Sequence, residues 1–176
     1  MHKYLFGLVI VLCLALFGCQ ANQEPMVDVA QQQAEAMAQK YVEIYSSGNM
    51  DLVAEVIDTA YVGHGPVSPE PIVGQDGFKA WVQRNRDQFS DLTLSFDRVI
   101  AKGEWVTFKW RVTGTNDGPM MEYPPTGQKM DIWGVTLSHV VNGKTVEEWF
   151  AYDLMTVYNQ LGFKLVPPKV ETGKKK

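Results

Sequence analysis

Cysteine is nearly absent from this sequence, since only Cys13 and Cys19 occur among its 176 residues. Both lie close to the N-terminus, so the chain has no thiol from residue 20 onward. Disulfides, thiolate metal sites and cysteine nucleophiles are therefore excluded from the body of the protein.

Positive charge is also sparse. The formal net charge is −4, and the only run of basic residues is Lys174–Lys176 at the C-terminus. Recognition of nucleic acid requires a basic surface, so we expect no nucleic-acid partner. We interpret residues 166–176 as a polar, solvated tail, with contact to anionic lipid as the alternative.

Long apolar runs are limited to one, from Leu5 to Phe17, which follows Lys3. A helix of this length reaches about 20 Å, which is too short for a bilayer core of about 30 Å. Because the run ends at Gly18 and Cys19, it predicts a signal peptide over residues 1–18.

The end of this segment, Leu16-Phe17-Gly18-Cys19, resembles the lipobox of bacterial lipoproteins. The resemblance implies lipidation at Cys19 and anchoring in a membrane through that lipid, with an ordinary secretory signal as the alternative. Residues 19–28 are polar and are expected to be a tether. Gln20 resembles the residue that directs such proteins to the periplasmic side of the outer membrane, so we expect a lipid-anchored protein of the bacterial cell envelope.

Residues 29–165 are expected to form one domain with one core. Apolar residues three and four apart predict a helix from Val29 to about Tyr45 and a short helix at 52–57 capped by Asn49. A loop is predicted to follow, holding Tyr61 and His64, and a further helix begins at Gly74.

From Leu92 the apolar period changes to two, which predicts a hairpin that turns at Lys102-Gly103. Two longer strands, at 128–141 and 144–154, are joined at Asn142-Gly143, and a short helix through Leu161 completes the domain. Helices followed by strands predict an α+β fold, with helices on one face of an antiparallel sheet.

Five stretches together resemble the SnoaL-like polyketide cyclases, or ester cyclases. They are residues 61–64, 71–78, 124–127, 142–149 and 160–162. The resemblance implies a cone-shaped α+β barrel of the nuclear transport factor type, in which about three helices pack on a curved antiparallel sheet around an apolar pocket. Members of the family close rings without metal or cofactor, using an aspartate and a histidine. An ungapped alignment places Phe150 at the aspartate position and Thr136 at the histidine position.

The register of the last hairpin decides which residues face the pocket. With a three-residue turn, Thr136 opposes Glu148 and even-numbered residues face the cone. The opposite face carries Trp133, Val135, Leu137, Trp149 and Ala151, and it is too apolar for water. We therefore expect a homodimer through this outer sheet face.

Glu148 and His64 are the candidate catalytic residues. A carboxylate in an apolar cone has a raised pKa and exchanges protons near neutral pH, although a structural ion pair is the alternative. His64 is expected in a loop at the pocket opening, as an acid/base or only a packing contact. Asp153 and His139 are expected to be structural. The spacing of Asp, Glu and His fits no metal motif, so no metal is expected. The family resemblance implies that no other cofactor is needed.

Aromatic residues are expected to line a pocket that suits a small hydrophobic molecule, although aromatics at helical spacing can equally be core. The predicted lining is Tyr45, Tyr61, Phe78, Trp81, Thr136, Phe150 and Tyr152. Three interpretations remain: a cofactor-free lyase or isomerase of the cyclase type, a binding module without catalysis, and a protein-interaction module using the outer face. The loss of both family catalytic residues favours the second.

Overall fold

The computed structural model describes residues 28–67, 69–164 and 166–167. The predicted signal peptide, Cys19 and nearly all of the tether and tail therefore lie outside the described residues. Within the described part, no helix is long and apolar enough to cross a membrane.

The predicted first helix is confirmed. Helix α2 (Val29–Val42) begins at Asp28, whose carboxylate accepts a hydrogen bond from the Gln31 amide at 3.2 Å. It continues into a π-helical turn, η1 (Glu43–Ser47), which ends at Gly48 in the left-handed conformation. The buried residues of α2 are spaced three and four apart, as the pattern predicted: Ala34, Met37, Ala38 and Tyr41.

The remaining helices are η2, a 3₁₀ turn (Met50–Leu52), α3 (Val53–Val56), α4 (Gly74–Gln88) and α5 (Leu154–Gln160). Asn49 precedes η2, but its side chain makes no capping hydrogen bond, so the predicted cap is wrong. Asp153 caps α5 by accepting from the amides of Met155 and Thr156, which agrees with a structural role.

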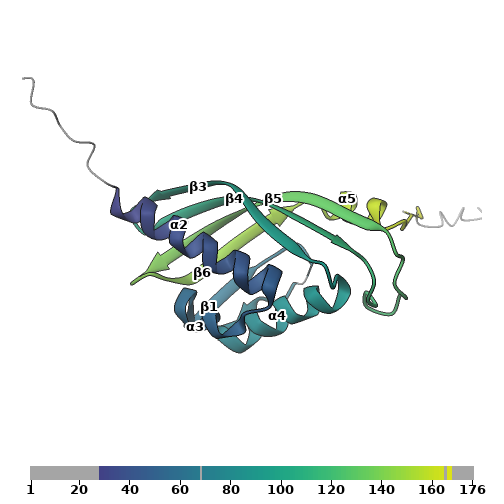
Figure 1. Ribbon diagram of the computed structural model, residues 1–176, viewed down its shortest axis with the longest axis horizontal. Coiled ribbons are helices and arrows are strands. Elements are labelled where there is room, and N and C mark those ends of the chain that lie inside the picture. The colour runs from purple at the N-terminus through teal and green to yellow at the C-terminus, as the bar shows by residue number, and fades with distance from the viewer. Residues whose placement is uncertain (1–27, 68, 165, 168–176) are drawn as a thin grey trace, which may run out of the picture.

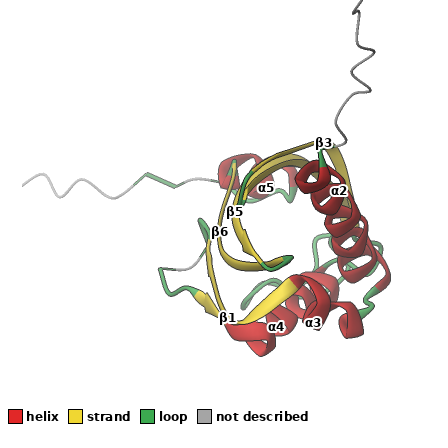
Figure 2. Cartoon of the chain, turned by 90° about the vertical axis from the view of Figure 1, so that its left-hand side faces the viewer, coloured by secondary structure: helices red, strands yellow, loops and turns green. Residues whose placement is uncertain are grey.

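Six strands form one sheet in the order β2-β1-β6-β5-β4-β3. Their bounds are β1 (Ile57–His64), β2 (Ile72–Val73), β3 (Thr93–Lys102), β4 (Trp105–Thr115), β5 (Lys129–Val141) and β6 (Lys144–Tyr152). Helix α2 lies along the edge strand β3, where the Gln31 side chain donates to Val99 O and accepts from Ala101 N (Figure 1). The sheet bends so that its concave face turns toward α2 and α4 (Figure 2).

The structure confirms an α+β fold but corrects the predicted sheet in one respect. Residues 57–64, which we predicted to end a helix and continue as a loop, form strand β1. This strand pairs parallel with β6, so the sheet is mixed and not purely antiparallel. The partners are far apart in sequence, from Ile57 with Thr145 to His64 with Trp149, so no local hairpin signal marks the pairing.

The predicted register of the last hairpin is also wrong. Asn142 and Gly143 both have positive φ, at 51° and 76°, which is the backbone of a two-residue turn. A bulge between His139 and Val140 then shifts the pairing, so Ser138 opposes Glu148 and Thr136 opposes Phe150.

Beyond the bulge, even-numbered residues still face the concave side, as predicted. The two-residue turn shifts the pairing by one residue and the bulge shifts it by one more, so residues of the same parity again lie on the same face. Thr136, Ser138 and Glu148 are buried on the concave face, whereas Trp133, Leu137 and Trp149 are exposed on the convex face. Next to the turn the parity differs, and Thr145, not Val146, is the fully buried residue.

Candidate functional site

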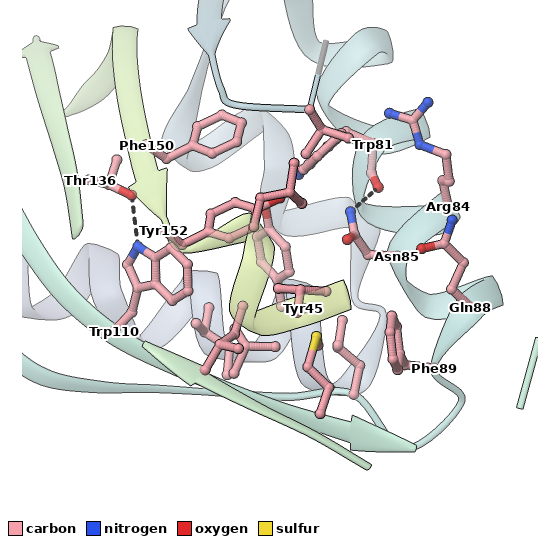
Figure 3. Close-up of a pocket in the computed structure, with 18 of the residues that line it drawn as sticks. Tyr45, Trp81, Arg84, Asn85, Gln88, Phe89, Trp110, Thr136, Phe150 and Tyr152 are labelled. Atoms are coloured by element: carbon pink, nitrogen blue, oxygen red, sulfur yellow. Dashed lines mark hydrogen bonds between the residues drawn. The ribbon is translucent and has the colours of Figure 1, made fainter. Parts of the chain in front are cut away.

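A cavity of about 400 Å³ lies on the concave side of the sheet. Its walls come from α2, α4, α5 and strands β3 to β6, and most of them are aromatic or aliphatic (Figure 3). Of the residues predicted to line a pocket, the cavity is bounded by Tyr45, Trp81, Thr136, Phe150 and Tyr152, and Glu148 also borders it. The volume suits a small organic molecule, and the composition suits an apolar one.

Glu148 is the acidic residue of this lining. Its side chain comes from β6 and is buried, with 6% of its surface exposed. Glu148 Oε1 accepts a hydrogen bond from the Tyr61 hydroxyl at 2.5 Å, and Oε2 accepts one from Ser138 Oγ at 3.3 Å. Burial raises the pKa of Glu148 above that of an ordinary glutamate, and the two hydrogen bonds oppose this without cancelling it.

Tyr61 and Phe78 do not border the cavity, so their prediction as lining residues is wrong. Both are almost completely buried behind the cavity wall, with their rings in edge contact at 5.5 Å. Tyr61 reaches the site through its hydroxyl, which holds Glu148. Burial raises the pKa of Tyr61, and the nearby Glu148 carboxylate raises it further, so the phenol stays protonated and remains a donor.

Thr136 lies on the same face as Glu148, on the neighbouring strand β5. Its Oγ1 accepts a hydrogen bond from Trp110 Nε1 at 3.0 Å, as Figure 3 shows. The indole can reach across β5 because residue 134 is glycine, where a Cβ would lie 2.2 Å from the Trp110 ring. With its oxygen engaged as an acceptor, the Thr136 hydroxyl has its proton free to donate into the cavity.

Polar side chains of α4 border the cavity, and sequence reasoning missed them. The residues missed are Arg84, Asn85 and Gln88, which share one helical face with the predicted lining residue Trp81, as Figure 3 shows. The Arg84 guanidinium lies 5.0 Å from the centre of the Trp81 ring, and Asn85 Nδ2 donates to Trp81 O at 2.7 Å. The spacing of residues 81, 84, 85 and 88 could have shown that these polar side chains share the face of Trp81. Charged and polar residues on a helix are usually assigned to the solvent-facing side, however, so this spacing was not used.

The predicted position of His64 is wrong. His64 is the last residue of β1, does not border the cavity, and has its Nε2 2.9 Å from Glu147 Oε1. Its ring stacks on Trp149 at 5.4 Å. Because Glu147 and Glu148 are successive strand residues, this pair lies on the opposite side of the sheet from the cavity.

The convex face carries a row of stacked rings. The Trp149 ring lies between the rings of His64 and Trp105, and the ring centres of Trp149 and Trp105 are 6.3 Å apart. The Trp105 ring in turn stacks on His139, with the ring centres 4.8 Å apart. His139 Nε2 lies 3.3 Å from Glu104, which agrees with the structural role expected of it. Trp133 is the most exposed aromatic residue here, at 64%.

No group of three or more His, Cys, Asp or Glu side chains that could hold a metal ion occurs in the part of the chain that the structure describes. What the cavity offers instead is a buried carboxyl, a hydroxyl donor and apolar walls.

A curved sheet closed by helices around an apolar cavity defines the cone-shaped α+β class to which nuclear transport factor-like domains belong. A family profile described as SnoaL-like polyketide cyclase matches residues 35–161, and the chain belongs to this family.

Individual relatives agree. The chain is 29% identical over 128 residues to aklanonic acid methyl ester cyclase DnrD of Streptomyces peucetius, which covers 72% of this chain and 88% of that protein. IdmH of Streptomyces antibioticus has a similar fold, with a TM-score of 0.65 and 25% identity over 74% of this chain and 99% of IdmH. TsrD of Streptomyces laurentii matches with a TM-score of 0.68 and 20% identity, over 75% of this chain and 96% of TsrD.

Proposed function

We propose that this protein binds a small hydrophobic ketone in its cavity and that Glu148 moves a proton on it without a metal or other cofactor. The observation that carries the proposal is the buried Glu148 carboxyl, which borders an apolar cavity and has a raised pKa. A carboxyl in such surroundings accepts and returns protons near neutral pH more readily than one in water. The relationship to ester cyclases supports chemistry next to a carbonyl group.

The reaction uses two groups that touch the ligand. The Glu148 carboxylate removes a proton from the carbon beside the ligand's carbonyl, the C–H electron pair forms a carbon–carbon double bond, and the π electron pair of the C=O bond moves to the carbonyl oxygen. The Thr136 hydroxyl donates a hydrogen bond to that oxygen and stabilises its negative charge. Protonated Glu148 then returns a proton to the product, and in D₂O this proton is first exchanged for a solvent deuteron. Tyr61 and Trp110 are positioning residues, since they hold Glu148 and Thr136 respectively.

A second candidate is a binding module without catalysis. The resemblance assigns the family's aspartate and histidine to the positions of Phe150 and Thr136, and in the structure these two residues are cross-strand partners that both border the cavity. A phenylalanine cannot transfer protons, so the cyclase reaction itself would require Glu148 to act alone from a different position.

The test is deuterium uptake by 2-acetylnaphthalene, an aryl ketone with exchangeable methyl protons, in D₂O buffer. We expect the wild-type protein to accelerate the exchange and Glu148→Gln to abolish the acceleration while the fold remains intact. Glu147→Gln is the matched control, because it removes the neighbouring carboxylate on the other face of the sheet. Binding without accelerated exchange would favour the binding module. Native mass spectrometry of the purified protein would show whether a molecule from the host is retained.

We also propose the two attachments that the sequence predicts. The lipobox-like segment supports anchoring through lipid at Cys19 in the cell envelope, on the periplasmic side of the outer membrane. The exposed apolar convex face supports a homodimer, because exposed tryptophans at the centre of a sheet are typical of interfaces.

A further inference from the structure

We infer that the ligand of this cavity carries a carboxylate, which Arg84 and Gln88 of α4 bind, at the end of the molecule away from its reacting carbonyl. The inference rests on the proposed function, since it names the class of molecule that the same cavity accepts.

The charges of the lining lead to this class. Among the described residues that border the cavity, only Glu148 and Arg84 carry a formal charge. Glu148 is buried and held by Tyr61 and Ser138, whereas Arg84 is exposed at the surface end of the cavity. A molecule that fills the cavity therefore meets a hydrogen-bonding end at the sheet and a cationic end at α4.

Arg84 is available to a ligand. Among the described residues its guanidinium makes no hydrogen bond or ion pair, and its contact is with the face of Trp81 at 5.0 Å. By contrast, Arg86 on the same helix donates to the backbone oxygens of Tyr45 and Ser46 at 2.7 and 2.8 Å, which makes it structural. The two arginines are two residues apart, so they point to different sides of α4.

The surroundings of Arg84 are suited to a planar acid. Trp81 holds the guanidinium by a cation–π contact and packs its own ring against Phe150 at 5.5 Å. Gln88 lies one helical turn after Arg84 and adds an amide donor on the same face (Figure 3). Arginine binds carboxylates through two parallel hydrogen bonds, and a neighbouring amide adds a third donor.

The ends of the cavity are also placed for such a molecule. Figure 3 shows Thr136 and Trp110 on one side of the cavity, and Arg84 with Gln88 on the other, with Tyr152 and Tyr45 between them. A ligand that places its carbonyl at Thr136 thus directs its opposite end toward α4. An aromatic keto acid combines both requirements.

The experiment compares two probes, 6-acetyl-2-naphthoate and its methyl ester, by isothermal titration calorimetry. The ester replaces the negative charge of the acid with a methyl group and keeps the rest of the molecule. We expect the wild-type protein to bind the carboxylate more tightly than the ester. Arg84→Gln is expected to weaken carboxylate binding about tenfold to a hundredfold and to leave ester binding unchanged, because a charge-assisted hydrogen-bond pair contributes on that scale. Lys79→Gln, which removes the same charge from α4 at a residue that does not border the cavity, is the control.

The outcomes separate this inference from the proposed function. Equal binding of acid and ester by the wild type, or an equal loss of both in Arg84→Gln, would overturn the inference while leaving an apolar, ketone-binding cavity in place. Deuterium uptake at the acetyl group of the ester reports on Glu148 independently of Arg84. Failure of the wild type to bind either probe would overturn both.

Discussion

Glu147 and Glu148 are adjacent in β6 and point to opposite faces of the sheet. Glu147 is partly exposed and pairs with His64, whereas Glu148 is buried beside the cavity. The same side-chain chemistry therefore has two roles, which are set by strand geometry alone. A substitution of Glu147 therefore serves as the control for the same substitution of Glu148.

The raised pKa of Glu148 predicts a pH-dependent stability difference. At low pH, Glu148 is protonated in both the folded and the unfolded chain. As the pH rises above the Glu148 pKa of the unfolded chain, the unfolded chain ionises first, because the folded-state pKa is higher. The free energy of unfolding therefore falls until the pH passes the folded-state pKa. The cost is about 1.4 kcal/mol for every tenfold difference in proton affinity. Glu148→Gln lacks this titration, so we expect its stability relative to wild type to increase as the pH rises from about 4, where an ordinary glutamate titrates, up through the higher folded-state pKa of Glu148.

Urea unfolding of both proteins across this range provides the measurement. Contributions from groups that the substitution does not change cancel in the difference between the two proteins. Parallel stability curves for the two proteins would show that Glu148 keeps an ordinary proton affinity in the fold.

For single residues, the sequence predicted that Glu148 is the buried acid, because strand alternation places it on the same sheet face as Thr136 and Phe150. The sequence could not predict that Tyr61 would hold it. Tyr61 and Glu148 are separated by 87 residues and are joined by a parallel pairing that has no local pattern. His64 was misplaced for the same reason, since its strand was read as a loop.

Among the elements, the connection between β4 and β5 depends on Asn116, which is fully buried. Its side-chain amide donates to Gln88 O and Gly118 O, and its carbonyl oxygen accepts from the amide and hydroxyl of Thr126. This one side chain therefore joins the end of α4 to the loop that precedes β5.

We expect Asn116→Ala to lower the free energy of unfolding by on the order of 3 kcal/mol, because several buried polar partners lose their hydrogen bonds together. Chemical unfolding measures the change, and Asn159→Ala, at an exposed position on α5, is the control. A loss no larger than that of the control would show that water replaces the amide. The amino-acid sequence gives no reason to single out Asn116, since its importance comes from contacts across the fold.

The helices and the last four strands were predictable because each carries its own period. The turn at Asn142-Gly143 was located correctly, but it has two residues where three were predicted. The bulge after His139 was not predicted, since a bulge changes the pairing without changing the apolar pattern. For this reason the cross-strand partner of Glu148 was wrong although its face was right.

For the whole molecule, the convex sheet face predicts self-association. Trp133, Val135, Leu137 and Trp149 are all exposed there in the single chain. We expect Leu137→Lys to convert a dimer into a monomer, because it places a charge at the centre of the apolar face at a position that is already exposed and so tolerates the change in the isolated fold. Sedimentation velocity measures the mass.

Met155→Lys is the matched variant, since Met155 is an exposed apolar residue on α5 and not on the sheet. It should leave the mass unchanged. A wild-type protein that sediments as a monomer at all concentrations would exclude the dimer and leave this face to another partner.

The parallel pairing of β1 with β6 also bears on how the chain reaches its native state. The hydrogen bonds that residues 57–64 make to β6 must wait for residues 144–152, and such distant pairings fold slowly because a long loop must close first. The strand that brings Glu148 to the cavity is also the last one to be synthesised. The concave face therefore lacks its last strand until β6 has joined the sheet, and we expect the partly folded chain to be prone to aggregation over that interval.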